Sequence, residues 1–217
     1  MSDERASIEV LEGGPLLVKN LDKLTGADGR PVEKPVERED SDRNLFALCR
    51  CGGSANKPFC DGTHKENGFT GERGSPEEEG VRVCEGQELT IVDNPGACCH
   101  AGECVDGAPD VFFRWEGDER RAVPDADERQ KIIDTIRRCP SGSLAYRLGD
   151  ELHDEYFSEA EIFVSEDGPL HVRGGPELVD ESGAAPVSKD HYALCRCGAS
   201  KNKPFCDGAH RDAGFTG

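Results

Sequence analysis

The chain of 217 residues is poor in the residues that build a large hydrophobic core. Only 35% of its residues are apolar and 6% are aromatic, with a single tryptophan and a single methionine. One core of that composition cannot stabilise a domain of this length. We therefore expect several small domains, each held together by something besides the burial of apolar side chains.

Long apolar runs and basic residues are also scarce. The longest aliphatic stretch, Leu16–Val18, is far too short to span a bilayer, and the N-terminal MSDERASIEV lacks the basic and apolar parts of a signal peptide. Lys and Arg total 26 against 44 Asp and Glu, a formal charge of −18. This charge disfavours nucleic acid and anionic membranes as partners and favours a protein with a basic face. The sequence predicts a soluble, cytoplasmic protein.

Cysteine is abundant, and part of the cysteine-rich sequence occurs twice. Residues 44–71 read NLFALCRCGGSANKPFCDGTHKENGFTG, and residues 190–217 read DHYALCRCGASKNKPFCDGAHRDAGFTG. A strand-turn-strand pattern precedes each copy, with turns marked by Gly14-Pro15 and Gly168-Pro169. The stretch from about Glu78 to Asp150 matches neither copy. We predict three domains, 1–77, 78–150 and 151–217, of which the outer two are repeats.

Each repeat carries the pattern C-x-C-x8-C-x3-H, which is typical of a metal site, because cysteines of a cytoplasmic protein stay reduced. The candidate ligands are Cys49, Cys51, Cys60 and His64 in the first repeat and Cys195, Cys197, Cys206 and His210 in the second. A short helix that starts near Asp61 would place His64 one turn from Cys60, so that thiolate and imidazole can share one inorganic centre. A structural zinc ion is the alternative on ligand chemistry alone, although zinc sites prefer C-x2-C spacing.

The full motif, C-x-C-x2-S-x3-P-F-C-D-G-x-H, resembles the signature of the CDGSH (mitoNEET-type) iron–sulfur proteins. Both copies match it, including Ser54 and Ser200. The resemblance implies that each repeat binds one [2Fe–2S] cluster through three cysteines and one histidine. Proteins of this type dimerise around a shared β structure. We therefore expect the two repeats to pair within one monomeric chain, around a pseudo-two-fold axis.

The ligand set has chemical consequences. Three thiolates leave an oxidised [2Fe–2S] cluster less negative than four would, which predicts a reduction potential above that of all-cysteine ferredoxins. Histidine is the ligand that protonates near neutral pH, so we expect clusters that are lost in acid. The flanking Lys57, Lys203, Arg50 and Arg196 either offset the cluster charge or are solvated loop charges.

The middle segment carries a different cysteine pattern, Cys98-Cys-His-Ala-Gly-Glu-Cys104 followed by Cys139-Pro140. From about Val83 to Arg147 it resembles the divergent single-cluster ferredoxins. The resemblance implies a [3Fe–4S] or [4Fe–4S] cluster held by Cys98, Cys104 and Cys139. Cys99 and His100 are candidates for a fourth donor, although Cys99 is expected to point away from the cluster. The alternative is a degenerate ferredoxin without a cluster.

The remaining features of this region are structural. A helix is predicted over residues 126–138, with Asp125 as N-cap and a buried stripe of Ile132, Ile133 and Ile136. Cys84 is interpreted as a small buried residue on a strand. The three histidines without cysteine neighbours are interpreted as ordinary surface or strand residues: His153, His171 and His191.

These patterns predict an α+β protein in which two small β-rich iron–sulfur domains flank a small ferredoxin-like domain. Electron transfer is the expected function. The alternatives are a redox or iron sensor or cluster donor, and a structural zinc module. A phosphate loop, a nucleotide fingerprint and a nucleophile elbow are absent from the sequence, so we do not expect an enzyme. The expected partner is a redox protein or an apo-acceptor protein with a basic face.

Overall fold

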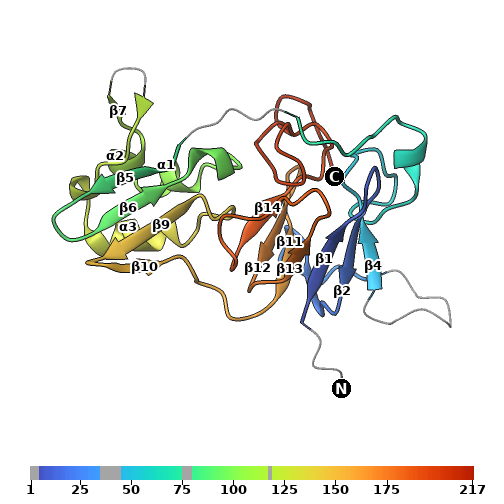
Figure 1. The fold of residues 1–217 in the computed structure, drawn as a ribbon, viewed down its shortest axis with the longest axis horizontal. Helices are drawn as coiled ribbons and strands as arrows, with labels where there is room; N and C mark the ends of the chain where they lie inside the picture. Colours follow the sequence, from blue (N-terminus) through green and yellow to red (C-terminus); the bar gives the residue numbers. More distant parts are fainter. Residues whose placement is uncertain (1–4, 35–44, 75–79, 117–118) are drawn as a thin grey trace.

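The computed structural model describes residues 5–34, 45–74, 80–116 and 119–217. Three sheets of four strands each dominate this part of the chain, with the strand orders β13-β1-β2-β4, β14-β12-β11-β3 and β10-β9-β6-β5 (Figure 1). Helices are few and short. The fold is α+β, as the sequence predicts, and the predicted boundary at residues 77 and 78 lies outside the described residues.

The two repeats have the same strands in the same order. These are β1 (Ser7–Val10), β2 (Leu16–Lys19), β3 (Lys23–Thr25) and β4 (Leu45–Leu48), then β11 (Glu161–Val164), β12 (Leu170–Arg173), β13 (Glu177–Val179) and β14 (Tyr192–Leu194). Three strands of each repeat pair with one another in antiparallel fashion. The short third strand joins the other repeat instead. β3 runs parallel to β11, and β13 runs parallel to β1.

A single apolar core lies between the two exchanged sheets. Leu16 and Val18 alternate with half-buried neighbours along β2, as a strand with one face inward requires. Residues from both repeats that are 0% exposed meet in this core, among them Ile8, Leu16, Val18, Ile162, Leu170 and Val172. Neither repeat has a complete core of its own, which explains why units of this size pack as a pair.

The middle domain has its own sheet and its own core. Its strands are β5 (Arg82–Glu85), β6 (Thr90–Asp93), β9 (Leu144–Leu148) and β10 (Glu151–His153), all antiparallel, and β10 lies just past the expected boundary at residue 150. Its helices are α1 (Glu103–Gly107), α2 (Pro109–Phe112) and α3 (Arg129–Ile136). Ile91 and Tyr146 of the sheet pack in one core with helix residues such as Val111 and Ile132. Short elements complete it, namely β7 (Trp115–Glu116), β8 (Glu119–Arg120) and the 3-10 turns η2 (Pro95–Ala97) and η3 (Pro124–Ala126).

The helix α3 is shorter than predicted. It begins at Arg129, because Glu128 has extended backbone angles and the preceding residues form the separate turn η3. The prediction of Asp125 as N-cap is wrong. Its Oδ1 accepts a hydrogen bond from the backbone N–H of Gln87 at 2.8 Å. The predicted stripe of isoleucines is buried and packs in the core of the middle domain.

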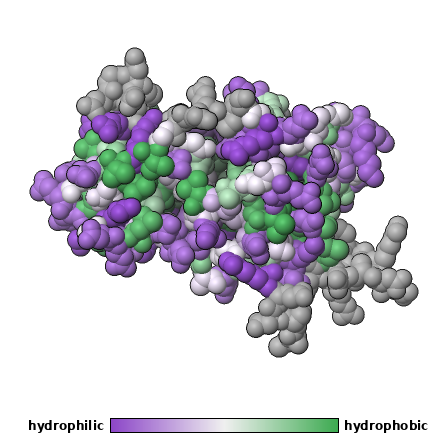
Figure 2. Space-filling view, viewed as in Figure 1, coloured by the Kyte–Doolittle hydropathy of each residue, from purple (hydrophilic) through white to green (hydrophobic). Residues whose placement is uncertain are grey.

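The surface is largely polar. Figure 2 shows a mostly hydrophilic face with apolar patches over the middle domain and over the strands of the repeats. The exposed large apolar residues of the middle domain include Val83, Leu148 and Leu152. In the described part of the chain, no helix has the length and apolar character needed to cross a bilayer.

Candidate metal centres

The predicted ligands of each repeat lie in two pairs. In the first repeat, Cys49 Sγ and Cys51 Sγ are 3.7 Å apart, and Cys60 Sγ is 3.4 Å from His64 Nδ1. The corresponding distances in the second repeat, Cys195 to Cys197 and Cys206 to His210, are 3.7 and 3.5 Å. The two sites therefore have the same internal geometry.

Each pair has the spacing of two donors on one tetrahedral metal. Two sulfurs at about 2.3 Å from a tetrahedral metal lie about 3.8 Å apart, and a sulfur and an imidazole nitrogen lie about 3.5 Å apart. Among the described residues, no three His, Cys, Asp or Glu side chains form a group suited to one metal ion. The donor set of each repeat thus fits a group of two metal atoms, with two donors to each, better than a single zinc ion.

Backbone hydrogen bonds bring the two pairs of the first repeat side by side. The Cys49 N–H donates to the Pro58 carbonyl at 2.8 Å, and the Cys60 N–H donates to the Ala47 carbonyl at 2.9 Å. The buried hydroxyl of Ser54 donates to the carbonyl of Phe59 at 2.7 Å and closes the loop between them. The signature residues Ser54 and Pro58 therefore shape the loop that returns Cys60 to β4.

Asp61 fixes the turn that carries the histidine. Its Oδ1 accepts hydrogen bonds from the backbone N–H and the hydroxyl of Thr63, at 3.0 and 2.7 Å. Its Oδ2 accepts a third from the Ala55 N–H at 2.8 Å. The hydrogen bonds from Thr63 and Ala55 hold the pKa of the Asp61 carboxyl well below its usual range. The predicted short helix forms as the 3-10 turn η1 (Thr63–Lys65), with the His64 imidazole turned toward Cys60.

The arginine of each C-R-C segment is buried, so its interpretation as a solvated charge is wrong. Arg50 and Arg196 are 3% and 1% exposed. Arg50 Nε donates to the Gly14 carbonyl at 2.7 Å, and Nη2 donates to the Leu11 carbonyl at 2.6 Å. Arg196 makes equivalent bonds, to the carbonyls of Gly168, Ser165 and Gly217 at 2.8, 2.7 and 2.6 Å. Each guanidinium ties the ligand loop to the preceding hairpin and places a positive charge behind the cysteines.

The two ligand loops meet at the pseudo-two-fold axis. Gly52 has a φ of 77°, and a Cβ at this position would lie 2.4 Å from the carbonyl oxygen of Cys197. Gly198 has a φ of 80°, and its Cβ would lie 2.8 Å from the carbonyl oxygen of Cys51. Glycine is required here both by the positive φ and by the close approach.

One thiol is prepared for metal binding by its neighbour. A hydrogen bond between Cys195 and Cys197 lowers the pKa of the Cys197 thiol, while the same bond and burial raise the pKa of Cys195. Thiolate is the form that binds metal, so this bond favours Cys197 as a ligand.

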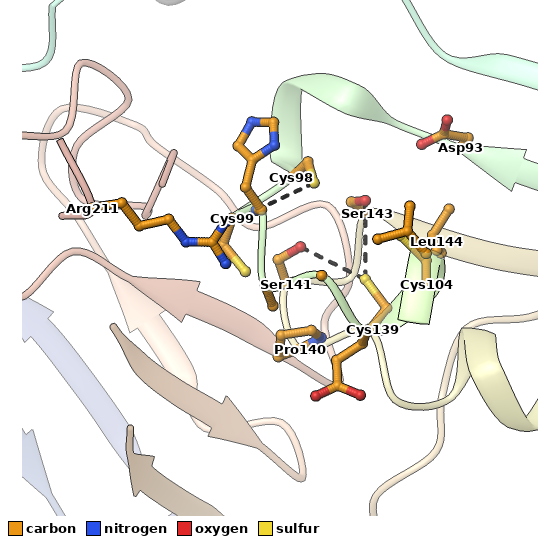
Figure 3. A pocket seen from close by; sticks show the side chains of 15 residues that line it. Asp93, Cys98, Cys99, Cys104, Cys139, Pro140, Ser141, Ser143, Leu144 and Arg211 are labelled. Atoms are coloured by element: carbon orange, nitrogen blue, oxygen red, sulfur yellow. Dashed lines mark hydrogen bonds between the residues drawn. The ribbon is translucent and has the colours of Figure 1, made fainter. Parts of the chain in front are cut away.

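The three predicted ligands of the middle domain line one pocket (Figure 3). Cys98 follows the turn η2, Cys104 lies in α1, and Cys139 follows α3. The pocket has a volume of about 170 Å³. Pockets for organic ligands usually measure roughly 300–1,000 Å³, so this one is suited to a small inorganic group.

Hydrogen-bonding groups lie beside two of these thiols, Cys98 and Cys139. The backbone N–H of His100 donates to Cys98 Sγ at 3.4 Å. The Cys139 thiol donates to Ser143 Oγ at 4.0 Å, and Ser141 Oγ lies 3.7 Å from the same sulfur. Hydrogen bonds to ligand sulfurs orient them and tune the reduction potential of iron–sulfur clusters. Three thiols around one small pocket, two of them with hydrogen-bonding neighbours, fit an iron–sulfur cluster.

Comparison with known proteins agrees with this geometry. A family model described as iron-binding zinc finger CDGSH type matches residues 13–65 and 167–211. "Uncharacterized protein YjdI" of Escherichia coli strain K12 is 31% identical to the chain over 68 residues, which are 31% of the chain and 87% of that protein. The chain belongs to the CDGSH-type iron-binding family.

The other comparisons complete this result. The protein of the same name from Escherichia coli O157:H7 matches with the same identity and coverage. A family model described as divergent 4Fe-4S mono-cluster matches residues 84–149, between the two CDGSH repeats. No solved structure matches the chain. The CDGSH protein is an iron–sulfur protein of two repeats and an inserted mono-cluster domain, which confirms both resemblances seen in the sequence.

The structure confirms some of the remaining sequence predictions for the CDGSH protein and contradicts others. Cys84 is buried on β5, as predicted. Cys99 borders the middle pocket, but its buried side chain packs against Ala193 and Cys206 of the second repeat. The interpretation of His191 as an ordinary surface or strand residue is wrong, since it is fully buried outside the strands and its Nδ1 lies 3.1 Å from Asp190 Oδ2. Burial lowers the pKa of this imidazole.

One residue of the middle pocket could not be found from the sequence. Arg211, which directly follows the predicted ligand His210, lines this pocket together with the three cysteines of the middle domain. It belongs to a different family match and lies far along the chain, so sequence spacing carries no signal of its position.

Proposed function

We propose that this CDGSH protein is an electron-transfer protein with two [2Fe–2S] clusters. The first is held by Cys49, Cys51, Cys60 and His64, and the second by the equivalent residues Cys195, Cys197, Cys206 and His210. The paired spacing of the donors carries this proposal, because each pair fits one metal atom of a binuclear group. Such a cluster takes up and releases one electron, at a potential that histidine ligation raises.

The middle domain is proposed to hold a [4Fe–4S] or [3Fe–4S] cluster through Cys98, Cys104 and Cys139. The small pocket and the hydrogen bonds of Cys98 and Cys139 support this assignment. The remaining metal position, if the cluster has four irons, would take a donor other than Cys99, whose side chain packs on the second repeat.

The rest of the chain supplies a rigid and charged setting for these sites. Arg50 and Arg196 hold the ligand loops and place positive charge next to anionic clusters. We propose a monomeric, cytoplasmic carrier. Its formal charge of −18 favours a redox partner that presents a basic face. We propose no enzymatic step for it.

Cluster donation is the second candidate, and one observation favours it for the first repeat. Cys60 is half-buried, whereas its equivalent Cys206 is 3% exposed. An apo-acceptor could therefore reach the Cys60–His64 pair more easily than the Cys206–His210 pair. Incubation with an apo-ferredoxin would show transfer of about one cluster per chain if donation is the role, and no transfer if the clusters only carry electrons.

The experiment that tests the proposed function is metal and sulfide analysis of anaerobically purified protein, together with EPR. We expect about four irons in the two repeats and three or four more in the middle domain. Dithionite should give reversible one-electron signals without loss of iron. The double variant Cys51→Ser/Cys197→Ser should lose both [2Fe–2S] signals, whereas the control Cys84→Ser, at a buried cysteine away from the ligands, should lose none. Stoichiometric zinc without sulfide would refute the proposal.

A further inference from the structure

The middle domain contacts the second CDGSH repeat next to the predicted ligands of both sites. Cys99, Ala193 and Cys206 form a separate buried cluster and are 2%, 2% and 3% exposed. Cys99 is bonded to the middle-site ligand Cys98, and Cys206 is a ligand of the second repeat. The two sites are therefore separated at this point by one peptide bond and one side-chain contact.

Two further contacts border the same junction. A Cβ at Gly208, two residues after Cys206, would lie 3.0 Å from Cδ2 of His100. The side-chain Nδ2 of Asn202 donates to the Gly96 carbonyl in turn η2 at 3.1 Å. The ligand loop of the second repeat thus lies against the segment that carries Cys98 and His100.

Arg211 of the second repeat is exposed and lies at the edge of the middle site. Its side chain lines the pocket of Cys98, Cys104 and Cys139 (Figure 3), and its backbone is joined to His210. A single residue therefore adjoins a ligand of one site and supplies a positive charge to the other.

The first repeat has none of these contacts among the described residues. The equivalents of Ala193 and Cys206 are Ala47 and Cys60, which are half-buried. At Gly62, the equivalent of Gly208, an added Cβ would meet no atom within 4 Å, and Asn56 and Lys65 are exposed. In Figure 1, strands of the second repeat lie between the middle domain and β1, β2 and β4 of the first.

We propose that the middle site and the second CDGSH site form a coupled redox pair, positioned by Cys99 and Arg211, and that the first CDGSH site is not directly coupled to the middle site. This inference rests on the proposed function, since it requires iron–sulfur clusters in these sites. Two chemically equal repeats thereby differ in role, because only one of them touches the inserted domain. Cys99 acts as a spacer between the sites, and Arg211 stabilises negative charge in the middle site.

The first test measures magnetic interaction between pairs of sites. Cys51→Ser removes a ligand of the first site and leaves the middle and second sites, and the matched Cys197→Ser leaves the middle and first sites. After dithionite reduction, the [2Fe–2S] EPR signal of Cys51→Ser should be broadened and relax faster than that of a Cys51→Ser/Cys104→Ser control without the middle cluster. The signal of Cys197→Ser should match that of its own Cys104→Ser control.

The outcomes separate the pairing from the proposed function. The pairing is overturned if the [2Fe–2S] EPR signal is broadened equally in both single variants, or is not broadened in Cys51→Ser. In either case the protein still holds iron and sulfide, so the proposed function stands. A middle site that holds no iron in the wild-type protein also overturns the pairing, and the two [2Fe–2S] sites of the proposed function stand. A protein without iron or sulfide refutes the proposed function itself.

The second test uses the charge of Arg211. Arg211→Gln should lower the midpoint potential of the middle site, because it removes a positive charge that favours the reduced, more negative state. Lys65→Gln makes the same change of charge at the equivalent position of the first repeat and should leave this potential unchanged. Arg211→Lys should restore most of the wild-type value. The midpoint potential is measured by EPR-monitored redox titration. Equal shifts of this potential in Arg211→Gln and Lys65→Gln would show that Arg211 does not act on the middle site.

Discussion

Replacing Arg196 by methionine tests how the ligand loop of the second repeat is held. Methionine fills a similar volume but leaves the carbonyls of Gly168, Ser165 and Gly217 without their donor. Hydrogen bonds to a charged group contribute about 1.5–3 kcal/mol each, so the loss of three should cost at least about 4.5 kcal/mol. For a chain of this size, 1 kcal/mol shifts the melting temperature by about 2–4 °C, so we expect a fall of at least about 9–18 °C.

The assay is thermal unfolding of cluster-loaded protein, followed by circular dichroism and by cluster absorbance at one fixed heating rate, since cluster loss makes unfolding irreversible. Arg129→Met is the matched control. Arg129 is exposed in α3, and its substitution should change stability by no more than about 0.5 kcal/mol. If Arg196→Met melts within about 2 °C of Arg129→Met, the buried guanidinium does not hold the loop and the argument fails.

Three further predictions concern other parts of the molecule. Gly52→Ala should lower the melting temperature at least twice as much as Gly29→Ala, because both residues have positive φ but only a Cβ at Gly52 meets the Cys197 carbonyl; equal effects would contradict the close contact. Burial lowers the pKa of His171 to about 4, below the value of about 6.5 in unfolded protein. Its contribution to stability is therefore present above pH about 6.5 and is lost as the pH falls toward 4, by about 3 kcal/mol in total. Denaturant titrations at several pH values should show a shallower dependence in His171→Gln, and an unchanged slope would show that this imidazole is not the cause. Finally, Cys104→Ser should abolish the EPR signal of the middle cluster and Cys99→Ser should keep it; the reverse would make Cys99 the ligand.

The parts of the site that depend on short-range geometry could be predicted from the sequence. Cys60 and His64 are close in the chain, so one turn is enough to bring them together, and the structure places them 3.4 Å apart. The strands of each repeat follow from alternation of apolar residues, as in Leu16 and Val18. The buried face of α3 follows from the spacing of its isoleucines.

Features that depend on distant partners could not be predicted. The pairing of Leu24 in β3 with Ile162 in β11 joins parallel strands of different repeats, and neither strand is marked by its own residues as one that leaves its repeat. The charge of Arg50 gives no sign that backbone carbonyls will surround it. The start of α3 was misplaced because Asp125 has the composition of an N-cap but hydrogen-bonds to Gln87 instead. In each of these cases tertiary contacts decide between local alternatives.

Through β3 and β13, each repeat gives one strand to the sheet of the other, as in a strand exchange within one chain. Each repeat contributes a strand to the other sheet, so the halves cannot separate as rigid bodies without breaking both sheets and opening the shared core. A protein cut between residues 74 and 80 should therefore remain a single particle, and fragments 1–74 and 80–217 made separately should find each other and assemble. Because the sheets and the shared core hold the two repeats together, the connection between the repeats need not do so and can contain an inserted domain.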